Sequence, residues 1–190
     1  MSAIGSLHVA RLCCCASGRE PNLMLNPASP LARLIETPIR PGRIVWIGLR
    51  PARRAAMTSV ETAIADMAEG LVGDRYNGRS GLRQVTLIQQ EHLATIASHL
   101  GLAEVAPEQL RRNIVVAGIN LAALKDHRFR LGSAVLASTG ECHPCSRMEE
   151  AFGPGGYNAV RGHGGITARV IESGAMAIGD KLERLPEAAT

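Results

Sequence analysis

Short apolar runs separated by glycine-containing turns set the strongest limit on what this chain can fold into. The segment GRIVWIGL, beginning at Gly42, is apolar and carries glycine near both ends, which is typical of a buried strand. Similar runs lie at 85–88 and within 111–119. One clear helical period follows the 85–88 run and ends at Gly101. The pattern predicts a mainly β or α+β domain with a few short helices, rather than a doubly wound sheet.

Two later segments complete the expected strands. FRLGSAVLAST, residues 129–139, is expected to form one strand that runs into a cysteine-containing stretch. Residues 166–185 are expected to form two strands around a Ser173-Gly174 turn.

The N-terminal residues have a different texture. Residues 1–40 carry four prolines, the cysteine triplet Cys13–Cys15 and no sustained hydrophobic period, and Met24 is a possible alternative start. The sequence therefore predicts an irregular extension over 1–40 and a single folded domain over 41–186.

Composition excludes several classes of function. Aromatic residues make up 3% of the chain, which argues against stacking surfaces for single-stranded nucleic acid. Residues 1–55 hold eight Arg and two acids, whereas residues 56–190 carry a net charge of −2, so the positive formal net charge of +4 belongs to the N-terminal part. No apolar run approaches the roughly 18–20 residues of a membrane helix, and five cysteines with three adjacent do not make a disulfide framework. We expect a cytoplasmic protein with no nucleic-acid or membrane partner.

The stretch STGECHPCSRMEE places Cys142 and Cys145 around a His-Pro dipeptide. A zinc site needs four ligands, and this pair with His143 supplies too few. A haem attachment motif needs His directly after the second cysteine, where Ser146 stands. A thiol–disulfide exchange pair stays open, although that motif normally begins the first helix of a βαβ unit. Polar neighbours indicate that the stretch is a loop open to solvent.

Two further segments carry groups that suit a binding site. Arg111, Arg112 and Asn113 stand at the entry to an apolar strand, and guanidinium groups suit anions, although a solvated charge pair would look the same. The loop RGHGGITARV contains Gly164 and Gly165, which permit close backbone approach, and a plain tight loop explains them equally well.

A third polar segment, GLVGDRYNGRSGLRQVTL, places Asp74 directly after a glycine turn. Arg75, Arg79 and Arg83 follow it closely. Charged loop residues of this kind also occur simply because loops are exposed.

In their order along the chain, EGLVGDRY, RQVTLI, RRNIVVAGI, FRLGSAVLASTGECHPCSRM and GHGGITARVIESGAMAIGD resemble the MOSC domain, named after the C-terminal region of molybdenum cofactor sulfurase. The resemblance covers residues 42–184 and is closest to the compact, stand-alone bacterial type. It implies a MOSC-type β-barrel, binding of the molybdenum cofactor and reduction of N-hydroxylated compounds. The family is also associated with pyridoxal phosphate binding.

The resemblance assigns roles residue by residue. The family's metal-binding cysteine corresponds to Cys145, and a single soft sulfur suits molybdenum because the pterin supplies two more. Arg112 stands where related members often have proline, and Asp74 matches the family's Gly-Asp motif with its role open. The residues implied in cofactor binding are Arg111, Asn113, Thr86, Gly164 and Gly165.

The function implied is that of a molybdenum-dependent oxidoreductase. Oxygen would leave a small N-hydroxylated substrate at molybdenum held by Cys145. A separate electron-donor reductase is implied, because no flavin or iron–sulfur motif is visible in the sequence. Two alternatives stay open: a sulfur or cofactor carrier that turns over no substrate, and a thiol–disulfide oxidoreductase using Cys142 and Cys145.

Overall fold

The computed structural model describes residues 26, 29–76, 78 and 80–186, and the chain divides into two compact units, 1–37 and 38–190. In the first unit, helix α1 (Pro30–Glu36) forms inside the segment for which the sequence predicts no regular structure. Its start is capped by Ser29, whose side chain accepts a hydrogen bond from Ala32 N at 3.1 Å, and Pro30 takes the first helical position. Cys13–Cys15 and Met24 lie outside the described residues.

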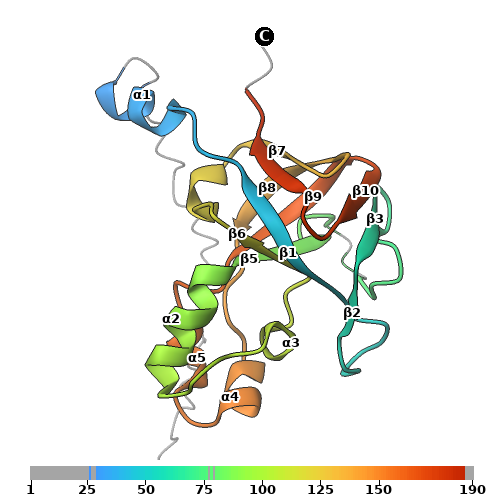
Figure 1. The fold of residues 1–190 in the computed structure, drawn as a ribbon, viewed down its shortest axis with the longest axis vertical. Coiled ribbons are helices and arrows are strands. Elements are labelled where there is room, and N and C mark those ends of the chain that lie inside the picture. Colours follow the sequence, from blue (N-terminus) through green and yellow to red (C-terminus); the bar gives the residue numbers. More distant parts are fainter. Residues whose placement is uncertain (1–25, 27–28, 77, 79, 187–190) are drawn as a thin grey trace, which may run out of the picture. The chain divides into compact units, whose positions relative to one another are not determined.

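The second unit is built on a closed barrel (Figure 1). Seven strands pair in the order β11-β7-β8-β9-β5-β6-β1, and β1 pairs again with β11 to close the ring. Only the β5–β6 pair of the ring is parallel. The barrel strands are β1 (Gly42–Leu49), β5 (Val85–Gln89), β6 (Ile114–Ala117), β7 (Arg128–Leu131), β8 (Ala134–Glu141), β9 (Ile166–Glu172) and β11 (Lys181–Arg184). The expectation of a β-barrel with a few short helices is confirmed.

Four further strands lie outside the ring. β2 (Thr58–Val60) pairs with β1. A separate three-stranded sheet contains β10 (Gly174–Ala177), β3 (Thr62–Asp66) and β4 (Gly70–Leu71), in that order.

The barrel interior is filled by aliphatic side chains, as the low aromatic content requires. Successive side chains of a strand point to opposite faces of the barrel wall. Leu87 of β5 therefore belongs to the barrel core, and its neighbour Ile88 belongs to a second apolar cluster on the outer face. That second cluster joins the barrel to the helices through Ile96 and Met148. Phe129, with no solvent exposure, lies in the barrel core.

The helices of this unit gather at one end of the barrel (Figure 1). They are α2 (Gln90–Leu100), α3 (Pro107–Leu110), α4 (Arg147–Phe152) and α5 (Gly156–Val160), whereas the 3₁₀ turn η1 (Leu121–Leu124) packs its buried leucines into the barrel core. α2 ends at Gly101, whose φ of 67° is left-handed, as the sequence predicts. With 11 residues α2 is the longest helix in the described part of the chain, and no helix there could cross a membrane.

Two strand predictions are wrong in the same way. Residues 129–139 form two strands, β7 and β8, because Gly132 takes φ 61° and turns the chain into a hairpin with Leu131 opposite Ala134. Residues 166–185 form three strands, because a second turn at Gly179, with φ 94°, separates β10 from β11. These two strands then join different sheets. In both places a glycine inside an apolar run marks a reversal.

Candidate functional site

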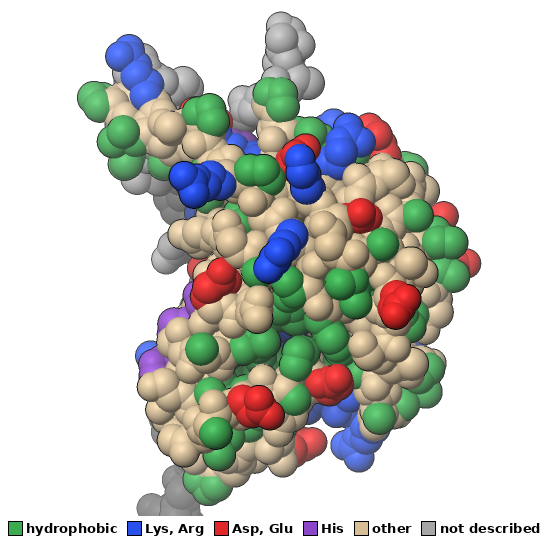
Figure 2. Space-filling view, in the orientation of Figure 1, with side chains coloured by type: hydrophobic (Ala, Val, Ile, Leu, Met, Phe, Trp, Pro, Cys, Tyr) green, Lys and Arg blue, Asp and Glu red, His purple; other side chains and the backbone are tan. Residues whose placement is uncertain are grey.

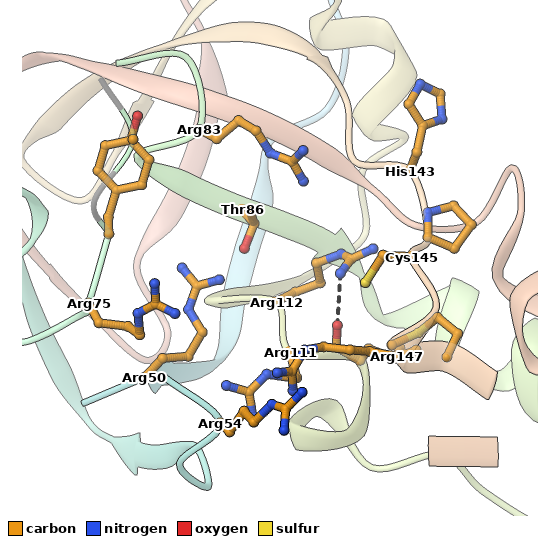
Figure 3. A pocket seen from close by; sticks show the side chains of 15 residues that line it. Arg50, Arg54, Arg75, Arg83, Thr86, Arg111, Arg112, His143, Cys145 and Arg147 are labelled. Atoms are coloured by element: carbon orange, nitrogen blue, oxygen red, sulfur yellow. Dashed lines mark hydrogen bonds between the residues drawn. The ribbon is translucent and has the colours of Figure 1, made fainter. Parts of the chain in front are cut away.

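A cavity of about 540 Å³ opens beside α3 and α4 (Figure 3). Four segments that are distant in sequence supply its walls: the β1–β2 loop, the β4–β5 connection with Thr86 of β5, the α3–β6 junction and the β8–α4 loop. The described residues that line it are Arg50, Arg54, Arg75, Tyr76, Gly78, Arg83, Thr86, Leu110, Arg111, Arg112, His143, Pro144, Cys145, Arg147 and Met148.

The two cysteines of the β8–α4 loop lie in different surroundings. Cys142 is buried, with 2% exposure, and its N–H donates to Gly165 O at 2.8 Å, which continues the β8–β9 pairing. Pro144 is buried next, and Cys145 is then exposed on the cavity wall, directly before α4. Both thiols are free. The loop therefore presents one sulfur to the cavity and holds the other within the fold.

Arg112 ties this loop to the rest of the site. Its buried guanidinium donates to the carbonyl oxygens of Gly164 at 2.7 Å, Leu110 at 2.8 Å and Cys142 at 3.1 Å. Burial lowers the pKa of Arg112, and the nearby thiols of Cys142 and Cys145 oppose that shift. In Figure 3 the Cys145 sulfur lies beside this guanidinium. Arg112, to which the sequence assigns no role, therefore links three segments: the start of β6, the loop around Gly164 and the β8–α4 loop that carries the cysteines.

The glycine loop packs behind the cysteine loop and does not line the 540 Å³ cavity. A Cβ on Gly164 would collide with the carbonyl oxygen of Cys142, and one on Gly165 would collide with that of Leu87. Gly165 also has φ 82°. Glycine is required at both positions because three backbone segments meet there without side chains between them.

Asn113 lies deeper than the cavity wall, at the centre of a buried polar network. Its Oδ1 accepts hydrogen bonds from the Thr86 hydroxyl at 2.8 Å and Arg50 Nη2 at 3.1 Å. Its Nδ2 donates to Gly48 O at 3.2 Å and to Asp74 Oδ1 at 3.1 Å. The amide is fully used inside the protein, so it orients Thr86 and Arg50, which do line the cavity.

Asp74 holds Arg50 in place. Its side chain has 0% exposure, and it accepts from Arg50 Nη2 at 2.7 Å and Arg50 Nε at 3.0 Å. This two-point contact fixes the plane of the guanidinium at the cavity wall. The Gly-Asp motif therefore acts through Arg50 and does not itself face the cavity.

The described lining contains seven arginines and no Asp or Glu. Burial lowers the pKa of Arg111, the positive charges of Arg147, Arg50 and Arg75 lower it further, and Asp74 opposes them. Like charges held this close favour an anion between them. The chemistry available is anion binding next to an exposed thiol.

Three of these arginines escaped sequence reasoning. Arg50 and Arg54 lie in the β1–β2 loop, and Arg147 begins α4, so their convergence depends on tertiary structure. Arg75 and Arg83 stood out only as charged loop residues, and Arg79 lies outside the described residues. The sequence does carry one signal of an arginine-rich site, because its basic residues are 19 Arg and 2 Lys.

Comparison with known proteins gives a family and a fold. A sequence model for the MOSC domain matches residues 74–183. Among proteins with curated descriptions, none matches this sequence. The YuaD protein from Bacillus subtilis is similar in structure at 20% identity, with a TM-score of 0.67 over 76% of this chain and 96% of that one. YiiM from Geobacillus stearothermophilus is 16% identical, with a TM-score of 0.63 over 76% and 75% of the two chains. YiiM from Escherichia coli is 18% identical, with a TM-score of 0.60 over 78% and 72%.

Proposed function

Because the chain belongs to the MOSC domain family, a family associated with the molybdenum cofactor, we propose that it binds this cofactor and reduces small N-hydroxylated compounds. The observation that carries the proposal is the exposed Cys145 thiol on the wall of an arginine-lined cavity.

The groups present fit the cofactor. Cys145 offers a soft sulfur donor, which suits molybdenum. Arginines such as Arg111 and Arg147 suit the phosphate of the pterin, and no acidic side chain in the described lining opposes it. Pyridoxal phosphate fits less well, because enzymes hold it through a lysine Schiff base and the described lining contains no lysine.

Each part of the site has a task in this proposal. Cys145 Sγ holds the metal, and Arg112 keeps its loop in place from behind. Arg111 and Arg147 bind the cofactor phosphate, and Asp74 aligns Arg50 beside them. When bound, the cofactor supplies two-electron oxygen-atom transfer. Conversion of N–OH to N–H takes two electrons and two protons and releases water, and we propose that a separate reductase supplies the electrons.

The test is elemental analysis with pterin fluorescence on protein expressed with molybdate, followed by an assay for reduction of an N-hydroxylated base with a chemically reduced dye. We expect both metal and pterin in the wild type and in Cys142→Ser, and loss of the metal in Cys145→Ser. Absence of both metal and pterin from the wild type would contradict the proposal. Bound cofactor without reduction would point to a carrier, and equal dependence on both thiols would point to disulfide exchange.

A further inference from the structure

The cavity arginines fall into an inner and an outer group. Arg50, Arg111, Arg112 and Arg147 are partly or fully buried. The outer arginines, Arg54, Arg75 and Arg83, are exposed. Figure 3 shows Arg75 and Arg83 at separate edges of the cavity, and Figure 2 shows basic side chains at the lower right of the molecule, where the β1–β2 loop that carries Arg54 lies in Figure 1.

The inner group is largely engaged within the protein, and most of the outer group is not. Arg112 is bound to three carbonyls, Arg50 to Asp74, and Arg111 donates to Ala55 O at 2.8 Å. In contrast, the guanidinium groups of Arg54 and Arg75 make no hydrogen bond or ion pair with any described residue. They are free to bind a ligand that enters from solvent.

Arg54 also occupies a backbone conformation that disfavours it. Its φ is 67°, and Arg111 has φ 57°; the one other non-glycine residue with positive φ in the described chain is Asp126. In such a conformation a residue with a side chain is strained relative to glycine, because its Cβ approaches the neighbouring carbonyl oxygen. Two of these three positions are thus arginines that line the same cavity. This indicates that an arginine side chain is needed at these positions to bind a ligand, despite the backbone strain.

The charge present exceeds what one cofactor phosphate neutralises. The described cavity lining carries seven guanidinium groups and no carboxylate, and the Asp74 carboxylate behind the wall is paired with Arg50. A phosphate monoester brings a charge of about −1.5 to −2. The cavity mouth therefore stays positive with the cofactor in place, and a positive mouth attracts anions and raises their association rate.

We propose that the substrate of this site is an N-hydroxylated molecule that carries a phosphate group, bound by Arg54 and Arg75 at the cavity mouth; this inference rests on the proposed function. Phosphate suits guanidinium groups from two separate loops better than carboxylate does, because it offers three accessible oxygens and a charge of about −1.5 to −2, whereas a carboxylate offers two oxygens and a single charge. An N-hydroxylated nucleotide has this chemistry.

The test compares N-hydroxycytidine with its 5′-monophosphate on cofactor-loaded protein. We expect kcat/KM to be about 10-fold or more higher for the monophosphate at low salt, and to fall with added salt for that substrate alone. Arg54→Gln and Arg75→Gln should lower the ratio between the two substrates through KM. Arg130→Gln, an exposed arginine of β7 outside the cavity lining, should leave the ratio unchanged. Equal kcat/KM for both substrates at low salt would overturn the inference.

Failure of the proposed reductase function can be distinguished from failure of phosphate recognition at the cavity mouth. If cofactor-loaded protein reduces neither compound, the reductase proposal fails, and calorimetric titration of the same protein with cytidine and cytidine 5′-monophosphate decides the inference. Tighter binding of the monophosphate that is weakened by Arg54→Gln supports phosphate recognition at the mouth. Equal binding of the two compounds overturns it.

Discussion

The guanidinium of Arg112 donates a hydrogen bond to the main-chain carbonyl of Cys142 at 3.1 Å, across 30 positions of sequence. The same group reaches Gly164 O at 2.7 Å. One buried side chain therefore fixes the distance between the loop that carries the exposed thiol and the glycine loop behind it. Because a buried carbonyl that loses its donor is costly, such a residue is hard to replace.

Replacement of Arg112 by Met should lower the free energy of unfolding by about 2–4 kcal/mol, because three buried carbonyls lose a charged donor. Urea denaturation measures this change. Arg112→Lys should recover part of the loss, since an ammonium group can reach some of these carbonyls. A loss below about 0.5 kcal/mol for Arg112→Met would show that the three bonds are dispensable.

Alkylation should separate the two cysteines. Cys145 is exposed and Cys142 has 2% exposure, so iodoacetamide should modify Cys145 in the native protein and Cys142 only after unfolding. Peptide mass spectrometry measures the alkylation of Cys142 and Cys145 separately from each other and from that of the N-terminal cysteines. Equal rates of modification in the native state would contradict the buried position of Cys142.

Asp74→Ala should destabilise the protein by about 3–5 kcal/mol, because it leaves the Arg50 guanidinium without its buried partner. Glu183→Gln provides the matched control: Glu183 is 44% exposed and lies 3.8 Å from Lys181. This exposed pair should contribute less than about 0.5 kcal/mol. Similar losses from the two variants would contradict the central position of Asp74.

The glycine loop offers a matched pair of substitutions. Gly165→Ala combines a positive φ with a collision against Leu87 O, whereas Gly162, with φ 83°, has no atom within 4 Å of an added Cβ. Gly162→Ala should therefore cost only the backbone strain of about 1–2 kcal/mol, and Gly165→Ala should cost clearly more. Thermal unfolding measures both. Equal losses would show that the close approach at Gly165 relaxes easily.

His92 should make stability depend on pH. Burial lowers its pKa, the neighbouring His163 lowers it further, and Glu91 opposes the charge effect. The unfolded chain therefore binds a proton at higher pH than the folded chain, so stability should fall as pH drops below about 6.5. His99, next to His163, belongs to the same cluster. His92→Gln should flatten the dependence between pH 7 and pH 5, as measured by urea denaturation, and an unchanged slope would contradict this origin.

Sequence reasoning reached part of the candidate site. Of its residues, Cys145, Arg111 and Thr86 line the cavity, whereas Asn113 and the glycine loop lie behind the wall. Arg112 could not be assigned, because its three partners belong to segments as far away as residue 164. Spacing within one segment cannot reveal a contact of that kind.

Local patterns along the chain were sufficient for strands β1, β5, β6 and β9, the main helix and its end at Gly101, because side-chain period and glycine conformation act over a few residues. They also marked the cysteine stretch and the arginine-containing strand entry. Tertiary structure alone decided which cysteine faces solvent, which sheets the later strands join, and how seven arginines from distant loops come to share one cavity. Barrel closure brings those loops to the same end of the molecule, and this long-range arrangement leaves no periodic trace in the sequence.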